Sequence, residues 1–78
     1  MKENEHLDFP LEKFYSIKDN KEMLLRLSIG INKDKYWVES DIVTKESKKI
    51  VSHLGFQQNL DSVFDAIQFG LNYYHSLR

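Results

Sequence analysis

The strongest structural signal in the chain lies in residues 23–44, MLLRLSIGINKDKYWVESDIVT. In the first part of this stretch, every second residue is apolar: Met23, Leu25, Leu27, Ile29 and Ile31. A period of two is typical of a β-strand that buries one face. The polar residues 32–35 make a connection of the length that closes hairpins, and β-branched and aromatic residues resume over 36–44. The stretch therefore predicts a β-hairpin over about residues 23–44.

The side chains in the second arm of this hairpin are expected to point alternately to the two faces of the sheet. Tyr36, Val38 and Ile42 share one parity, and Trp37, Glu39, Asp41 and Val43 share the other. Successive side chains of a strand point to opposite faces of the sheet, so these two groups are separated. We expect Trp37 to be either exposed or covered by another part of the chain.

The segment before the hairpin is expected to add a short strand. Residues 14–18 are aromatic and β-branched, and residues 19–22 are turn-like. A competing interpretation begins a helical turn at Pro10, with Leu11, Phe14 and Tyr15 on one face. We prefer the strand. Residues 1–12 are predicted to form an acidic, flexible arm that precedes the domain.

Residues 45–56 fit two interpretations. As a strand, residues 50–54 would follow a charged loop and add a fourth member to the sheet. As a helix, Thr44 would be the N-cap, and Gly55 would end the helix at the position where glycine is favoured. We prefer the strand, and both interpretations stay open here.

The C-terminal segment predicts a helix from Asn59, a suitable N-cap, to Arg78, with Asp61 in its first turn. A helical stripe is expected to face the sheet: Leu60, Val63, Phe64, Ile67, Leu71 and Tyr74. Gly70 costs about 1 kcal/mol relative to alanine, which indicates either close packing or a weak point in mid-helix. The predicted fold is a single α+β domain over residues 13–78, an antiparallel sheet of three to four strands with one long C-terminal amphipathic helix packed on one face.

Length and composition limit the class of protein. The chain has 78 residues, 41% hydrophobic and 29% charged, with no cysteine. Disulfide frameworks, thiolate zinc sites and cysteine nucleophiles are therefore excluded. A core this small contributes roughly 3–5 kcal/mol unless a metal or a partner chain adds to it. The acidic start lacks the apolar segment of a signal peptide, and no apolar run approaches the roughly 18 residues of a membrane span. We expect a cytoplasmic protein with no membrane contact.

The net charge of −1 is unevenly distributed. Residues 1–12 carry one lysine against four acids, which gives −3. Residues 13–49 carry nine lysines and arginines against six acids, which gives +3. Residues 50–78 have two acids and one arginine, which gives −1. The predicted hairpin region is therefore mildly basic, and the predicted helix is nearly uncharged.

The apolar residues of the predicted helix extend beyond one face. Four more residues widen the sheet-facing stripe, namely Ala66, Phe69, Tyr73 and Leu77, to an arc of roughly 220° where a surface helix needs about 100°. A helix that is apolar on two faces needs two partners. We expect these four residues to form a protein interface, in a non-catalytic accessory, regulatory or inhibitor protein that forms a homodimer. The alternative cover is the N-terminal arm, folded over Phe69 and Tyr73 through Leu7 and Phe9.

Single-stranded nucleic-acid binding is the alternative function. Lysines interleave with aromatic residues in the basic region, and a basic sheet that bears aromatic side chains can stack unpaired bases. The candidate residues, which would also serve as a second protein interface, are Trp37, Tyr36, Tyr15, Lys33, Lys35, Lys48 and Lys49. Intervening acids and a pI near 6.3 count against this function. The element order over residues 13–78 resembles that of the PC4-like single-stranded-DNA-binding coactivators, a resemblance that implies dimerisation through the helix.

Catalytic chemistry has little support in the sequence. His6, His53 and His75 lie in the arm, a predicted strand and the predicted helix, and none has the spacing of a helical metal pair. His75 lies about 15 Å along the helix from Asp65, too far to share a proton. The three glycines are isolated, so no phosphate-binding loop is present. We therefore expect no enzyme, no catalytic or metal site and no cofactor.

Overall fold

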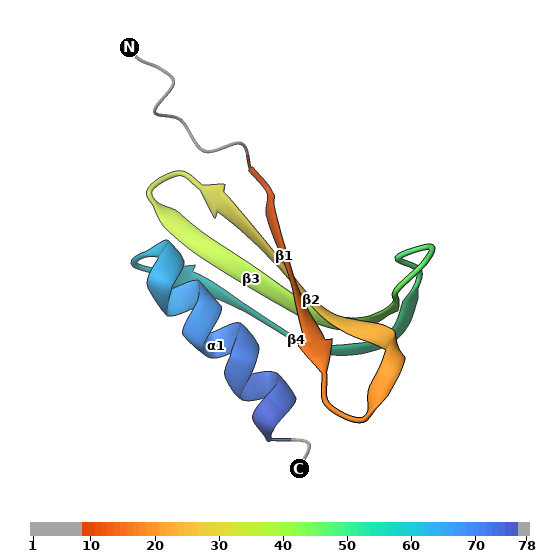
Figure 1. Cartoon of the computed structure of the whole chain (residues 1–78). Coiled ribbons are helices and arrows are strands. Elements are labelled where there is room, and N and C mark those ends of the chain that lie inside the picture. Colours follow the sequence, from red (N-terminus) through yellow and green to blue (C-terminus); the bar gives the residue numbers. More distant parts are fainter. Residues whose placement is uncertain (1–8, 77–78) are drawn as a thin grey trace.

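The computed structural model describes residues 9–76 and has an α+β arrangement (Figure 1). The strands are β1 (Leu11–Ile17), β2 (Asn20–Asn32), β3 (Lys35–Thr44) and β4 (Ile50–Leu60), and the helix is α1 (Val63–His75). They form one antiparallel sheet in the order β1-β2-β3-β4, with α1 across one face. The predicted fold class is confirmed. The predicted hairpin is also confirmed, because β2 and β3 pair from Asn32 with Lys35 to Met23 with Thr44.

Both ambiguous segments are strands. The helical interpretation of residues 45–56 is wrong, since residues 50–60 form β4 and pair with β3. The helical turn from Pro10 is also wrong, because β1 begins at Leu11 and pairs with β2. The last two residues of the predicted arm 1–12 therefore belong to the sheet. Residues 1–8, which include Leu7, lie outside the described residues.

The helix begins later than predicted. Its N-cap is Ser62, whose Oγ accepts a hydrogen bond of 3.0 Å from the Asp65 backbone N–H. Asn59, the predicted N-cap, instead lies in β4 with a φ of 64°. Asp61 consequently precedes the cap. At 13 residues, α1 is shorter than expected, because the strand continues as far as Leu60 and takes the residues assigned to the first turn.

The smallest residues of the helix lie closest to the sheet. Ala66 and Gly70 are buried, whereas Phe64, expected to face the sheet, is 68% exposed. A Cβ on Gly70 would lie 2.7 Å from Leu27 Cδ2, which confirms close packing as the reason for this glycine. Ser40 Oγ donates a 2.8 Å hydrogen bond to the Gly70 carbonyl oxygen. The predicted sheet-facing stripe is confirmed except at Phe64, because Leu60 is buried in the core and Val63, Ile67, Leu71 and Tyr74 pack against it. Ala66 and Gly70 lie beside this stripe, where small side chains permit the closest approach to the sheet.

The two faces of the sheet differ in what lies on them. The covered face, on which α1 packs, holds the core: Leu25, Leu27, Ile29, Val38, Leu60 and Ala66. The open face, on the other side, carries the alternate residues of each strand, including Arg26, Trp37 and Asp41. Within residues 9–76, no helix is long and apolar enough to cross a membrane.

Candidate functional site

The residues of the predicted protein interface occupy different environments. Ala66 is completely buried against the sheet, so its assignment to an interface is wrong. Phe69 is 41% exposed. Tyr73 is half-buried, because its ring lies over Gly55 and its hydroxyl donates a 3.0 Å hydrogen bond to the Phe56 carbonyl oxygen. Leu77 lies outside the described residues.

The aromatic residues of the predicted nucleic-acid surface lie on opposite sides of the sheet. Tyr15 and Tyr36 pack against the core on the covered face. Trp37 is on the open face, over Gly30 and 5.9 Å from the Phe56 ring between centroids. Phe9, the arm residue expected over Phe69 and Tyr73, instead has its ring 5.9 Å from that of Tyr36.

The lysines of the predicted nucleic-acid surface, like its aromatic residues, lie in different parts of the fold. Lys33 lies in the turn between β2 and β3, and Lys49 lies just before β4. Lys48 Nζ lies 5.4 Å from the Phe14 ring centroid. Lys35 Nζ donates a 2.5 Å hydrogen bond to Asp61 Oδ1, and this contact raises the pKa of Lys35 and lowers that of Asp61. The fold therefore does not gather the predicted set into one surface.

The open face instead brings polar residues together in rows across the sheet. Strand pairing aligns Phe14, Arg26, Asp41 and His53 in one row, with one residue from each strand. The neighbouring row is Glu12, Ser28, Glu39 and Phe56. Cross-strand neighbours on one face lie close enough for their side chains to interact. Three carboxylates, an arginine and a histidine are thus adjacent.

Asp41 is at the centre of this group. Its side chain is 0% exposed, although no helix within residues 9–76 covers this face. Arg26 Nη2 donates a 2.9 Å hydrogen bond to Asp41 Oδ2, and Arg26 Nη1 lies 3.6 Å from Glu12 Oε2. On the other side, His53 Nδ1 lies 2.9 Å from Asp41 Oδ1. The buried carboxylate therefore has a partner for each oxygen, as a buried charge requires.

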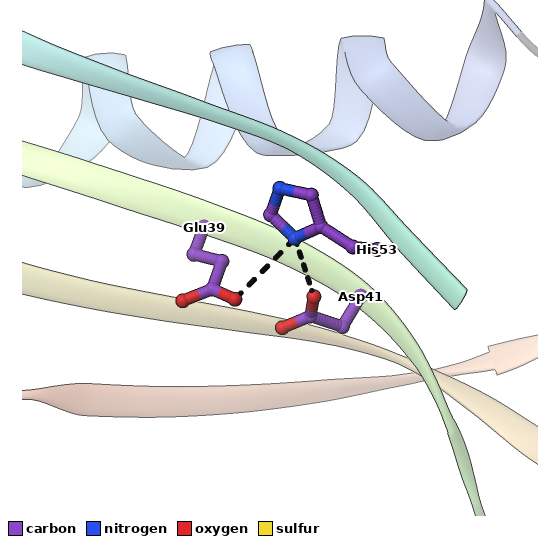
Figure 2. Close-up of side chains that lie close together, drawn as sticks. All are labelled: Glu39, Asp41 and His53. Carbon is purple, nitrogen blue, oxygen red and sulfur yellow. Dashed lines mark hydrogen bonds and ion pairs between the residues drawn. The ribbon is translucent and has the colours of Figure 1, made fainter. Parts of the chain in front are cut away.

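His53 faces two carboxylates through the same nitrogen. Figure 2 shows Nδ1 directed toward Asp41 and Glu39, with the other ring nitrogen pointing away from both. The distance from Nδ1 to Glu39 Oε2 is 3.4 Å. The hydrogen bond to Asp41 raises the pKa of His53, and the charges of Asp41 and Glu39 act in the same direction, while partial desolvation opposes them. The side chain is 55% exposed, so solvent reaches the imidazole.

A shift in strand pairing places His53 in this group. Ser40 pairs with Gly55, but Asp41 pairs with His53, so Leu54 has no partner on β3. In regular pairing, Asp41 would oppose Leu54, and His53 would point to the covered face. One extra residue in a strand reorients the side chains that follow it. The sequence indicated Glu39 and Asp41 on one face, but no sequence signal revealed this shift.

A surface hollow of about 470 Å³ lies elsewhere, at the ends of β2 and β3 distant from the β2–β3 turn. Its lining is mostly charged and polar: Lys21, Glu22, Thr44, Lys45, Glu46 and Ser47. None of the residues in the Asp41 group contributes to it. The hollow therefore adds no binding cavity to the open face.

No known family model matches the chain, and comparison with curated proteins and with solved structures finds no significant match to either.

Proposed function

We propose that this protein is a small, non-catalytic protein-interaction module that self-associates through the C-terminal helix and the adjoining edge of the sheet. One observation carries the proposal. The helix packs its two smallest residues, Ala66 and Gly70, against its own sheet, while both of its phenylalanines, Phe64 and Phe69, are exposed. Burying a phenylalanine side chain contributes about 1.5–3 kcal/mol, which this fold leaves unused on the helix.

The side of the helix next to β4 is the surface we assign to self-association. Phe69 lies one turn before Tyr73, and Tyr73 packs over Gly55 of β4. The same edge of the sheet exposes three more apolar residues of β4: Ile50, Val51 and Phe56 are each about half exposed, with Ile50 and Phe56 on the open face. We call Phe69, Tyr73, Ile50, Val51 and Phe56 the β4 margin.

The two edge strands differ in how they discourage contact with another chain. β1 has seven residues and carries Glu12 and Lys13, and charges on an edge strand oppose association. β4 has eleven residues, IVSHLGFQQNL, with neither acid nor lysine nor arginine among them. β4 itself therefore contributes no carboxylate or ammonium group that a second copy of the chain would have to desolvate. The same margin is the surface through which the module would act as an accessory or inhibitor of another protein.

The proposal is tested by measuring the mass of the full chain with size-exclusion chromatography and light scattering over a concentration series. We expect a dimer for the wild type and a monomer for Phe69→Asp, with the far-ultraviolet circular dichroism of both unchanged. Asn72→Asp, on the polar side of the same helix, is the matched control and should remain a dimer. A wild type that is monomeric at every concentration, or a Phe69→Asp variant that remains dimeric, contradicts the proposal.

Phe64→Asp tests the choice of surface, because Phe64 projects from the side of the helix opposite Phe69. We expect this variant to remain a dimer. If Phe64→Asp made the protein monomeric while Phe69→Asp remained dimeric, the interface would include Phe64 and not the β4 margin.

Nucleic-acid binding is tested separately by titrating Trp37 fluorescence with single-stranded oligonucleotides across a salt series. Glu39 lies two residues from Trp37 on the same face, and carboxylates repel phosphates, so we expect no quenching even at low salt. Quenching that weakens steeply as salt rises would favour nucleic acid as the ligand.

A further inference from the structure

We propose that Glu39, Asp41 and His53 form a binding site for one divalent transition-metal ion, with Zn²⁺ as the expected ion. The site lies on the open face, on the side of the sheet opposite to α1 (Figure 2). It uses other side chains than the proposed self-association, although His53 belongs to β4 and Phe56 of the β4 margin pairs with Glu39. The geometry of the ligand atoms, their number, their chemical type and the surrounding charge all support it.

Both distances from the His53 nitrogen are separations that a bound ion requires. One nitrogen and two carboxylate oxygens, one atom from each of the three side chains, all lie within 4.8 Å of one another. His53 Nδ1 is 2.9 Å from Asp41 Oδ1 and 3.4 Å from Glu39 Oε2. Atoms that bind the same ion at about 2.1 Å are about 3.0 Å apart at right angles and about 3.4 Å apart at the tetrahedral angle. An ion can therefore enter between them with small side-chain movements.

A cation also satisfies these three side chains better than a proton does. His53 Nδ1 faces both carboxylates, but a single N–H donates one strong hydrogen bond, and here the shorter distance is to Asp41. Glu39 is left with the longer contact of 3.4 Å. A metal ion at the centre would contact the nitrogen lone pair and both carboxylates at once.

The surrounding charges are balanced for a divalent ion. Glu12, Glu39 and Asp41 contribute three negative charges, and Arg26 contributes one positive charge, which leaves −2 when His53 is neutral. Arg26 binds Asp41 Oδ2 and leaves Oδ1 directed toward His53. Groups that hold a ligating carboxylate in place in this way are characteristic of metal sites.

The ligand types select the class of ion. An imidazole nitrogen favours Zn²⁺ and other transition metals, whereas Mg²⁺ and Ca²⁺ prefer oxygen ligands alone. Three protein ligands leave at least one coordination position for water or another ligand, which is the arrangement of an open zinc site. The 55% exposure of the His53 side chain gives solvent access to that position.

The test is calorimetric titration of the full chain with ZnSO₄, after treatment with a chelator and its removal. We expect one high-affinity ion per chain, and a dissociation constant raised about 100-fold or more in His53→Ala, because loss of a direct ligand costs at least as much as loss of an outer partner. Glu39→Gln should weaken binding less, since it retains two ligands and one amide oxygen. MgCl₂ titrated in the same way should give no saturable heat.

The matched controls are the other two histidines. His75→Ala removes an exposed imidazole from the helix, and His6→Ala removes the one in residues 1–8. Both variants should bind Zn²⁺ as the wild type does. In the wild type, Zn²⁺ should shift the ring-proton resonances of His53 selectively in the NMR spectrum. No saturable Zn²⁺ binding by the wild type, or undiminished binding by a folded His53→Ala variant, would overturn the site.

Discussion

The two faces of the sheet bury side chains by different means. On the covered face, Leu27, Ile29 and Val38 reach 0% exposure beneath the helix. On the open face, Asp41 and Val43 also reach 0% exposure, although no element of residues 9–76 packs over them as a second layer. Arg26 and His53 cover Asp41 from the neighbouring strands. In this small domain, complete burial therefore does not require a layer of secondary structure.

The energetic character of the two faces differs accordingly. Burial on the covered face is apolar and contributes roughly 25 cal/mol for each Å² removed from water. On the open face, the desolvation of Asp41 is offset by Arg26 and His53, so the net contribution of the intact group is small and removal of one member is costly. The covered face stabilises the domain, whereas the open face holds charged groups in fixed positions.

The largest loss of stability should come from a substitution at the centre of the covered face. Leu27→Ala is expected to lower the free energy of unfolding by about 4 kcal/mol, because it removes buried methyl groups and leaves a cavity under Gly70. Leu24→Ala, at a half-buried position on the open face, is the matched variant and should cost about 1 kcal/mol. Urea unfolding monitored by circular dichroism measures both. Equal losses would mean that the two faces contribute alike.

The second largest loss of stability should come from neutralising the buried carboxylate of Asp41. Asp41→Asn is expected to lower the free energy of unfolding by about 2 kcal/mol, because the neutral amide keeps the shape but loses the charge that Arg26 and His53 require. Asp34→Asn, in the exposed turn between β2 and β3, should leave stability unchanged. An Asp41→Asn variant as stable as the wild type would show that the open face does not depend on this charge.

A smaller effect is expected where a glycine lies beneath an aromatic ring of the open face. A Cβ on Gly30 would lie 2.2 Å from the Trp37 ring, so the ring must move in Gly30→Ala. We expect a loss of about 1 kcal/mol, together with a change in Trp37 fluorescence. Unchanged fluorescence would mean that the ring is not seated over Gly30.

The smallest effect should be the pH dependence contributed by His53 in the metal-free protein. Its pKa is raised above 6.5 in the folded state, mainly by the hydrogen bond to Asp41. The resulting stabilisation is complete below the unfolded-state pKa and is lost as pH rises through the folded-state pKa. With a chelator present, the stability of the wild type relative to His53→Gln should therefore decline as the pH rises above about 6.5. A constant difference over this range would show that the Asp41 contact does not favour protonated His53.

Sequence patterns anticipated features that depend on neighbouring residues in the chain. The alternation over residues 23–31 identified the central strand, and the spacing of Trp37, Glu39 and Asp41 placed them on one face. The helix and most of its sheet-facing stripe were also anticipated, but the exposure of Phe64 and the burial of Ala66 were not. Apolar residues cover so much of its circumference that periodicity does not distinguish Phe64 from Ala66 as the residue at the sheet. Contact with Leu27 and Val38 decides in favour of the small residues.

Patterns along the chain were enough to predict an α+β fold around a hairpin of alternating residues, and a helix with more apolar surface than one sheet can cover. The folded chain was needed to see that His53 lies beside Asp41 and Glu39, that Asp41 is buried, and that the phenylalanines of the helix are exposed. Side-chain periodicity is local and can be read along the chain. Strand register and helix rotation depend on contacts between residues far apart in the chain, which no local pattern encodes.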